Sequence, residues 1–565
     1  MSTWVIASCT RPIHCQLALM VGIASYALAC GSDSDRDRGS GGSVVATGGA
    51  ISSGAGGVAG SSLDATGGAS PGGASGNGGH TMGGGGVATG GTSIGGGGGA
   101  SSSGSAGASF DDGCSDELAQ GITVREIAVF QAGKIPVMQN GTAVAPQTGQ
   151  GAEIIQGKDS LFRVYVTADG DFQPRELSAR LQLNGRSLSY HVRTTIAGSS
   201  RELDADDSFN LEVPGSAITS NLDYRLEIVE CGAGSGTAHD PVFPASGVAP
   251  LATRRTGVVK ITMLPVTSGG VTPTLDQTFA DEIKVVAESM YPTTGIEITL
   301  NDTPAGDCGV TSETARDGDA WGECGDILRS RREHDQPPAD VYYVGILKPE
   351  PTYEEYCGEE CYNGYSLIGG VDAPSFRVAV LTAYLPHVAE VTFPHELGHS
   401  HGLYHAAGCG AGTPDPSYPY SVDGTSYIGW VGWDKGRPAI EFLDPELYPE
   451  FMSYCTETWI SDYTYRRIAD RIAAIAGARI SPGPARTWRV LLETPTALRW
   501  GVPITTPRSA EGEATWAAVL DADGEVSSQV TVYRVPSSLG GAVYMVPEPE
   551  AGWTAIAIDG RVLAF

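Results

Sequence analysis

The chain has 565 residues, enough for three ordinary domains. Its 35 basic and 65 acidic residues give a formal net charge of −30, and nucleic-acid phosphates would repel so acidic a surface. Because no interior stretch stays apolar for the ~20 residues of a membrane-spanning helix, we expect neither a nucleic-acid partner nor an internal transmembrane segment.

The N-terminus has the pattern of an export signal. A short apolar run, residues 16–28, is followed by small residues and then Cys30. This order is typical of a lipoprotein signal peptide, in which residues 1–29 are removed and Cys30 is lipidated. A plain secretory signal is the alternative, because Ala27 stands where leucine is usual. We expect an exported protein: an outer-membrane or cell-surface lipoprotein touching the membrane only through its lipid anchor, or else a secreted protein.

Residues 30–113 are expected to form a disordered linker. Glycine supplies 30 of the residues between 31 and 110, with serine and alanine beside it. Such a segment cannot bury enough apolar surface to offset the entropy of ordering the chain. As a flexible coil of ~80 residues it would span ~50 Å on average, which suits a tether.

Residues 114–250 are predicted to form a β-sandwich. Apolar and polar residues alternate, or nearly so, in four segments separated by Gly, Asn and Asp turns. The segments are 122–129, 161–166, 177–183 and 224–229. No catalytic grouping is visible in this part of the sequence.

Residues 255–480 change to a mixed pattern of strands and helices. One helix is expected to begin at a capping box from Thr274 to Gln277, and a closing helix is expected after a cap at Ser461 or Asp462. Their apolar faces would consist of Leu275, Phe279, Ile283 and Val286 in the first helix and of Tyr465, Ile468, Ile472 and Ile475 in the second.

Strands between these two helices are predicted at 258–264, 296–300, 341–347 and 377–382. A Gly-rich segment, residues 364–370, lies just before the last of them. It is either an edge strand against which an extended substrate pairs or an ordinary loop.

The run from His395 to His405 contains the pattern H-E-x-x-H-x-x-G-x-x-H. His395 and His399 are four residues apart, so on a helix both imidazoles share one face and can hold one Zn²⁺ at ~2.1 Å. Glu396 lies beside them and can take a proton from zinc-bound water. Gly402 lets the chain leave the helix with positive φ, so that His405 can return as the third ligand.

Two other residues of this region affect the prediction. Pro394 has no N–H, so the helix is expected to begin near Thr392 or to kink there. His401 is offset from His399 toward another face and is predicted not to be a ligand.

The eleven-residue pattern resembles the metzincin clan of zinc metallopeptidases. Members of the clan also have a methionine turn some tens of residues downstream that forms a floor under the metal, and the sequence Phe451-Met452-Ser453-Tyr454-Cys455 is similar to it. Met suits this place because its polarizable side chain packs under the imidazoles without competing as a ligand. The resemblance covers roughly residues 255–480 and implies a metzincin-like α+β catalytic domain.

Tyr454 stands where serralysin-like and astacin-like members have a tyrosine near the zinc. By this resemblance it would bind the metal at rest and then swing away to hydrogen-bond the oxyanion. A packed tyrosine bonded to the backbone is the alternative. The loop 429–434 matches neither family, and the long inserts with a lipoprotein-like start are more similar to large secreted peptidases that cut mucin-type glycoproteins.

Residues 486–565 return to short strands with Asp-Gly turns at Asp523-Gly524 and Asp559-Gly560, which predict a small C-terminal β-domain. The predicted fold is therefore multidomain. An α+β metzincin-like catalytic domain lies between an N-terminal β-sandwich and this C-terminal domain, after the Gly/Ser-rich linker.

In an exported protein the cysteines are expected to form disulfides, because oxidising surroundings favour them. Of the 11 cysteines, eight remain after two in the signal and the lipidated one are set aside. Pairing of sequence neighbours is our hypothesis, and free buried thiols are the alternative. The hypothetical pairs are Cys114–Cys231, Cys308–Cys324, Cys357–Cys361 and Cys409–Cys455.

The sequence thus predicts an exported zinc metalloendopeptidase that hydrolyses protein or glycoprotein substrates. His395, His399 and His405 would hold Zn²⁺, while Glu396 and Tyr454 would assist attack by zinc-bound water. A surface adhesin or glycan-binding protein with an accessory or silent peptidase domain is the alternative. A purely structural zinc fits less well, because structural sites usually have four protein ligands and are rich in cysteine.

Overall fold

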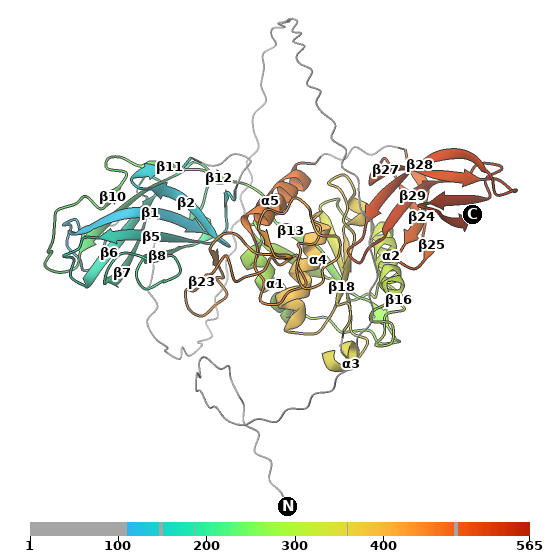
Figure 1. Ribbon diagram of the computed structural model, residues 1–565, viewed down its shortest axis with the longest axis horizontal. Coiled ribbons are helices and arrows are strands. Elements are labelled where there is room, and N and C mark those ends of the chain that lie inside the picture. The colour runs from blue at the N-terminus through green and yellow to red at the C-terminus, as the bar shows by residue number, and fades with distance from the viewer. Residues whose placement is uncertain (1–109, 146–150, 186, 359, 479–483) are drawn as a thin grey trace, which may run out of the picture. The chain divides into compact units, whose positions relative to one another are not determined.

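The computed structural model (Figure 1) describes residues 110–145, 151–185, 187–358, 360–478 and 484–565. The predicted signal peptide, Cys30 and the linker up to residue 109 lie outside these residues. Of the described residues, 37% are in strands and 16% in helices, so this part of the chain is mostly β. Within the described ranges, no helix is both long and apolar enough to cross a membrane.

Two antiparallel sheets make up the N-terminal part, where alternating segments predicted a sandwich. Their facing side chains form one apolar core. One sheet has the order β3 (Thr142–Ala143), β2 (Lys134–Gln139), β1 (Ile122–Phe130), β5 (Ser160–Ala168) and β8 (Phe209–Val213). The other has the order β10 (Val242–Phe243), β9 (Leu222–Glu230), β6 (Arg175–Leu183) and β7 (Leu188–Ile196), with β11 (Ala249–Leu251) also on β9. A short parallel pair joins β4 (Ile154–Ile155) to β12 (Thr253–Arg254).

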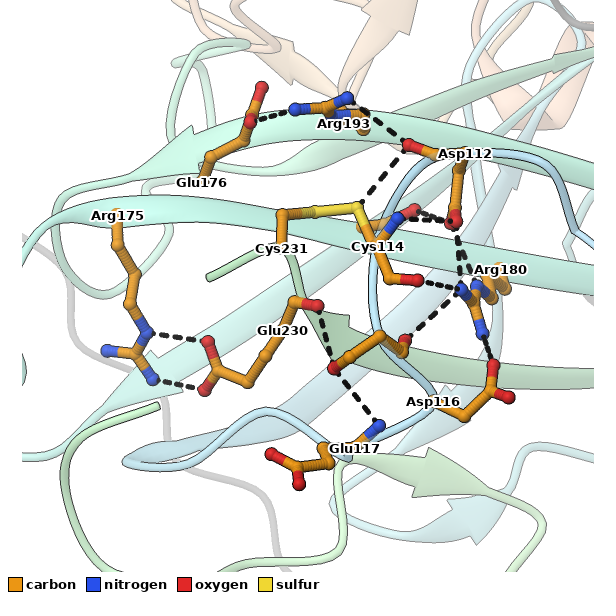
Figure 2. The surroundings of a disulfide bond; sticks show 12 residues. Asp112, Cys114, Asp116, Glu117, Arg175, Glu176, Arg180, Arg193, Glu230 and Cys231 are labelled. Atoms are coloured by element: carbon orange, nitrogen blue, oxygen red, sulfur yellow. Dashed lines mark hydrogen bonds and ion pairs between the residues drawn. A yellow bond between two sulfur atoms is a disulfide. The ribbon is translucent and has the colours of Figure 1, made fainter. Parts of the chain in front are cut away.

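The linker was predicted to extend to residue 113, but the folded part begins before residue 114. Figure 2 shows Asp112 paired with Arg180, with 2.8 Å between the carboxylate and Nε, and Cys114 joined to Cys231. Burial would raise the pKa of Asp112, but hydrogen bonds from Arg180 and Ser178 outweigh it and hold the pKa well below its usual value. Asp112 therefore belongs to the sandwich and packs against the middle of β6.

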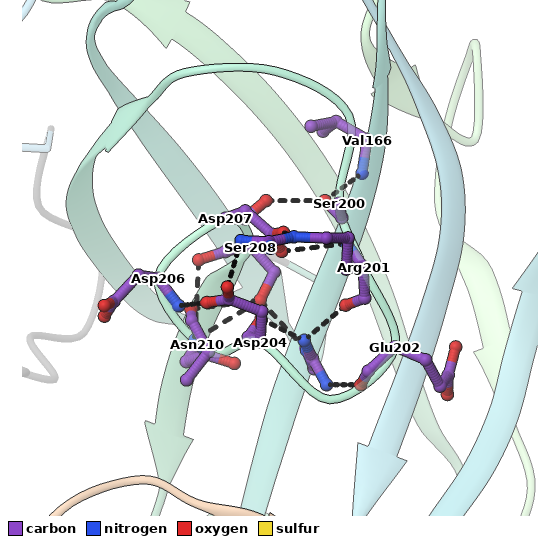
Figure 3. Close-up of polar contacts among 11 residues, drawn as sticks. Val166, Ser200, Arg201, Glu202, Asp204, Asp206, Asp207, Ser208 and Asn210 are labelled. Carbon is purple, nitrogen blue, oxygen red and sulfur yellow. Dashed lines mark hydrogen bonds and ion pairs between the residues drawn. The ribbon is translucent and has the colours of Figure 1, made fainter. Parts of the chain in front are cut away.

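The acidic loop between β7 and β8 is held in its conformation by contacts with arginine side chains. In Figure 3, the carboxylates of Asp204 and Asp207 both bind Arg201. The buried guanidinium of Arg163 donates to the carbonyl oxygens of Arg201 and Glu202 at 3.0 and 2.6 Å. These contacts fold the loop around two arginines.

A five-stranded sheet lies in the middle of the chain. Its order is β15 (Ile296–Leu300), β13 (Val259–Pro265), β17 (Val341–Leu347), β19 (Val378–Thr382) and β18 (Gly364–Ser366). The first four strands are parallel, and β18 pairs antiparallel with β19 at the edge. All four strands predicted here are confirmed, and the Gly-rich segment does contain an edge strand.

The helices show one correction and one omission in the sequence-based prediction. Helix α1 (Gln277–Met290) begins later than the predicted capping box, because Asp276 caps it by accepting from the N–H of Phe279 at 2.9 Å. Leu275 consequently precedes the helix, and the buried face is Ala280, Ile283, Ala287 and Met290. Helix α5 (Asp462–Gly477) is confirmed, with Ser461 as its cap.

Helix α2 (Gly318–Asp335) was not predicted, because its buried face contains charged residues as well as apolar ones. Arg329 is fully buried and bonds Asp326 and the carbonyl of Val502, while Arg332 donates to the carbonyl of Val341 at 3.1 Å. The apolar periodicity that identifies a helix in a sequence is therefore weak here.

The C-terminal part forms an eight-stranded sheet. Its order is β25 (Leu498–Trp500), β24 (Arg486–Glu493), β29 (Ala542–Pro547), β28 (Val526–Pro536), β27 (Glu513–Leu520), β30 (Ala555–Ile558) and β31 (Arg561–Ala564), with β26 (Ile504–Thr506) also on β24. Both Asp-Gly turns join neighbouring strands, and Gly524, Asp559 and Gly560 have the positive φ that such turns need. One face shares a core with α2 and the middle sheet, so this part packs on the site-bearing region.

The loop 429–434, which matched no family, contacts the sandwich. The N–H of Lys134 donates to the carbonyl of Val431 at 2.9 Å, and the indole of Trp459 donates to that of Ala132 at 2.7 Å. In this loop, β22 (Gly432–Trp433) pairs with β23 (Phe442–Leu443), which follows the loop in sequence. The segment leading to the methionine turn is thus held against the sandwich.

All four hypothetical disulfides are confirmed: Cys114–Cys231, Cys308–Cys324, Cys357–Cys361 and Cys409–Cys455. Four disulfides in one chain are typical of an oxidising, extracellular environment.

Candidate metal centre

The histidine motif begins on a short buried helix. Helix α4 (Phe393–Ser400) continues a five-residue π-helical segment, Val388–Thr392. Pro394 lies in the first turn of α4, directly after the junction with the π-helical segment. The α-helical part begins near Thr392 as predicted, but the chain is already π-helical before it, and the change from π to α hydrogen bonding at that point admits the proline.

His395, His399 and His405 form a compact buried group. The Nε2 atom of His399 lies 3.1 Å from that of His395 and 3.1 Å from that of His405. One ligand atom from each of the three residues can be chosen so that all lie within 4.8 Å of one another. Two nitrogens each ~2.1 Å from one Zn²⁺ would be ~3.0 to 3.4 Å apart for right-angled to tetrahedral coordination, so the observed spacing suits a shared cation.

Backbone carbonyl groups determine which nitrogen of each ring carries the proton. The Nδ1 atoms of His395, His399 and His405 lie 2.8–2.9 Å from the carbonyl oxygens of Phe451, Leu403 and Gly412. A carbonyl oxygen can only accept, so each Nδ1 must donate, and each Nε2 is left with a bare lone pair. The lone pair of His399 lies 3.1 Å from those of His395 and His405, and such lone pairs repel unless a cation lies between them. The donor set therefore fits a metal ion, and imidazole ligands suit zinc, copper, iron and nickel alike.

Burial keeps these imidazoles neutral. Desolvation, followed by the neighbouring His405, lowers the pKa of His395 to about 3. Burial also lowers the pKa values of His399 and His405, that of His399 well below its ordinary value. Since metal binding needs the neutral ring, the site requires little deprotonation at neutral pH.

A pH prediction follows from the direction of these shifts. Protons should compete with the metal only well below pH 6.5, the ordinary histidine pKa, so Zn²⁺ affinity should change less than about tenfold between about pH 8 and pH 6. Competition against a chromophoric chelator, corrected for the chelator's own protonation, measures it. A steep loss of affinity that begins near pH 6.5 would contradict the arrangement.

Two glycines shape the motif. Gly402 has φ +86°, which confirms the predicted left-handed exit from the helix and lets the chain turn back toward His405. Gly398 was not singled out in the sequence, yet a Cβ there would stand 2.5 Å from the Sδ of Met452. Met452 is buried, and its side chain packs against α4 at Gly398.

The turn that carries Met452 is closed by its own hydrogen bonds. The N–H of Ser453 donates to the carbonyl of Glu450 at 2.9 Å, and the Ser453 hydroxyl donates to the same oxygen at 2.7 Å. The carboxylate of Glu450 is fully buried and accepts from Tyr418 and from the backbone of Ser461. Glu450 thereby joins the turn to the cap of α5, a role that no sequence motif indicates.

The disulfide Cys409–Cys455 connects both sides of the site. Cys409 belongs to the loop whose Gly412 carbonyl orients His405, and Cys455 follows Tyr454 directly. Its loss releases a loop of 46 residues in sequence separation. We therefore expect it to contribute both to stability and to the position of the third ligand.

Replacing both cysteines, Cys409→Ser with Cys455→Ser, should lower the free energy of unfolding by about 4 kcal/mol in the chain-entropy model, given the separation of 46 residues. The matched control removes Cys357–Cys361, whose separation of 4 residues predicts a loss of about 2 kcal/mol. Urea unfolding without reductant measures both. A smaller loss for the long loop than for the short one would contradict the prediction.

Glu396 lies in the same pocket as the histidines. This pocket has a volume of about 820 Å³, and its lining includes His395, Glu396, His405 and Tyr454. Burial raises the pKa of Glu396 to about 8, and the nearby Ser538 hydroxyl offsets only part of the rise. Among the described residues, the Oε2 atom of Glu396 has no hydrogen-bond partner. The geometry therefore provides a buried carboxyl group with one oxygen available to a ligand in the pocket.

Tyr454 lies at the rim of the pocket. Its ring centroid is 4.8 Å from that of His405 and 5.8 Å from that of His395, and 42% of its surface is exposed. A packed tyrosine, which was the alternative, would be less exposed than this. It places the side chain where it can move without disturbing the core.

His401 is separate from the group, as predicted. It is buried, its Nδ1 lies 2.7 Å from the carbonyl of Leu397, and its ring stacks on Tyr342 with centroids 4.9 Å apart. The residue supports the packing of α4 on the sheet.

Models of known protein families give no match to this chain, and a search of curated proteins gives none either. The site is accordingly assigned from its own geometry: a buried group of three histidines that could hold a metal ion.

Proposed function

We propose that the protein is a zinc-dependent endopeptidase. The observation that carries the proposal is the convergence of three Nε2 lone pairs in a pocket that also contains the buried carboxyl group of Glu396. Three protein ligands leave a coordination position open, as in catalytic rather than structural zinc sites. The resemblance of the two motifs to metzincins points in the same direction.

Each residue of the pocket would have a definite task. A zinc ion, when bound, would supply Lewis-acid chemistry and lower the pKa of a coordinated water from about 15.7 to about 7. His395, His399 and His405 would hold the ion through Nε2, with their Nδ1 atoms anchored on carbonyl groups. The positive charge of a bound metal would favour the ionised form of Glu396 against the effect of burial, and the carboxylate would then accept a proton from the attacking water at its free Oε2 and pass it to the leaving amine.

Tyr454 would act on the substrate side of the site. Its exposed side chain beside His405 could donate a hydrogen bond to the oxygen that becomes negatively charged during attack on the peptide carbonyl. Such a donor contributes only if it reaches the oxyanion, so a Tyr454→Phe variant should lower kcat more than it raises KM.

The proposed substrate is a protein or glycoprotein outside the cell, since four disulfides suit an oxidising environment. A lipid anchor at Cys30 would keep the enzyme at the cell surface. Residue 30 lies outside the described ranges, so this part of the proposal rests on the sequence.

The test is to incubate metal-loaded protein with casein, a mucin-type glycoprotein and a mixed proteome, and to identify new peptide ends by mass spectrometry. We expect cleavage that chelator removes and added Zn²⁺ restores. Tight binding of the glycoprotein without any new peptide ends would favour an adhesin and contradict the proposal.

A further inference from the structure

The edge strand β18 has an outer side that a substrate could use. In the antiparallel pair with β19, Asn363 accepts from Thr382 at 3.0 Å and Leu367 donates to Val378. Alternate residues therefore bond to β19, and the residues between them direct their N–H and C=O groups away from the sheet. The outward residues in this stretch are Tyr362, Gly364, Ser366 and Ile368.

One end of this outer edge is occupied by the C-terminal sheet. The N–H of Ser538 donates to the carbonyl of Ser366 at 2.9 Å, and the Ser538 hydroxyl accepts from the N–H of Ser366 at 3.0 Å. The N–H of Ile368 donates to the carbonyl of Pro536 at 2.8 Å. The segment after β28 therefore pairs with β18 where an extended peptide would otherwise pair.

The other end is also occupied. The N–H of Tyr362 donates to the carbonyl of Ala315 at 2.9 Å, and its carbonyl accepts from the hydroxyl of Tyr356 at 2.6 Å. Within the described residues, Gly364 alone among these outward residues keeps a free N–H and C=O. A Cβ on Gly364 would stand 2.5 Å from Cγ of Glu396, so the one open backbone position lies directly beside the proposed base.

The loop between β28 and β29 is held in place by its own hydrogen bonds and by close backbone packing. Its backbone closes through the N–H of Ser537 to the carbonyl of Gly541 at 3.3 Å, and the Ser537 hydroxyl donates to the carbonyl of Gly540 at 2.6 Å. Gly541 has φ +80°, and a Cβ there would stand 2.1 Å from the carbonyl oxygen of Glu493. Ser538, Leu539 and Gly540 line the same pocket as the histidines.

We propose that the loop Ser537–Gly541 is a specificity element of the site. By occupying the outer edge of β18 at Ser366, next to Ile368 and Tyr362, which are bonded elsewhere, it limits backbone pairing of a peptide substrate to the single residue opposite Gly364. The protein then recognises the few residues around the scissile bond, and short peptides are bound as well as long ones. This inference rests on the proposed peptidase function. It revises the expectation that an extended substrate adds a whole strand to the 364–370 segment.

A nested series of internally quenched peptides tests the inference. The series keeps one scissile bond and grows by one residue at a time on each side. For the wild-type protein, we expect kcat/KM to stop rising once the residues next to the scissile bond are present. Each further backbone hydrogen bond along β18 would otherwise raise it about two- to tenfold.

Opening the edge should restore the dependence on length. Replacing Ser538-Leu539-Gly540 by Asn-Gly makes a two-residue hairpin that keeps the Ser537–Gly541 pair and removes the contact with Ser366. In this variant the backbone of Ser366 is free, so kcat/KM should rise with the added peptide residue that reaches it, while Ile368 stays bonded to Pro536 and Tyr362 to Ala315. Ser538→Ala is the milder version, and Ser527→Ala on the exposed part of β28 is the matched control, which should behave like the wild type.

Binding of the same series to Glu396→Gln protein, followed by fluorescence anisotropy, gives a readout without hydrolysis. A Kd that does not change with length supports the inference. A wild-type kcat/KM or Kd that improves with every added residue, and worsens when those residues are N-methylated, would overturn it. If the peptides bind with a flat Kd but none is cut by the wild type, the peptidase proposal fails while the restricted edge stands.

Discussion

Glu396→Gln is expected to abolish hydrolysis while the metal content stays unchanged. The amide has the shape of the carboxyl group but cannot accept a proton from the attacking water. General-base assistance accounts for about 10²- to 10⁴-fold in rate, so kcat should fall by at least that range. KM should change little, because the three histidines and the pocket remain.

The control for this variant is Glu390→Gln, which makes the same change at an exposed position of the π-helical segment before α4. Activity and metal content should both match the wild type. Undiminished turnover by Glu396→Gln, with equal metal loading, would remove Glu396 from the mechanism.

His405→Ala is expected to weaken Zn²⁺ binding most severely among single changes that leave α4 intact. The residue lies beyond the helix and supplies one of three proposed ligands. Loss of a group that merely orients a ligand costs about 10- to 100-fold in affinity, so loss of a ligand should cost more than about 100-fold. Isothermal titration or chelator competition measures it, and activity at limiting zinc should fall in parallel.

His387→Ala is the matched control, since His387 lines the same pocket but lies outside the three-histidine group. Its Zn²⁺ affinity should equal that of the wild type. Should His387→Ala lose the metal while His405→Ala retains it, the ligand set proposed here would be wrong.

Local patterns predicted much of the fold. The strands 296–300 and 341–347 alternate or run apolar between clear turns, and Ser461 caps α5 as its sequence position suggests. The capping box at Thr274 failed because Asp276, two residues later, provides a carboxylate for the same helix end. Helix α2 was not predicted because its buried arginines bond the carbonyl groups of Val502 and Val341, tertiary contacts that no periodicity reveals.

The candidate site likewise has residues that local sequence patterns predict and residues that they do not. The three histidines, Glu396 and Gly402 follow from spacing along one helix and its exit, which are local properties. The need for glycine at position 398 comes from Met452, which lies against it but is distant in the sequence. The role of Ser538 depends on a contact between residues 172 positions apart, Ser366 and Ser538, which no local pattern encodes.

The measurement that tests the central claim most directly is zinc-edge X-ray absorption on carefully purified protein, combined with elemental analysis. We predict one zinc ion per chain, with three imidazole nitrogens at ~2.1 Å and an oxygen in the remaining position. The His405→Ala protein should lose one nitrogen from this shell. Protein without a bound transition metal, or a shell of sulfur or carboxylate ligands, would contradict the account.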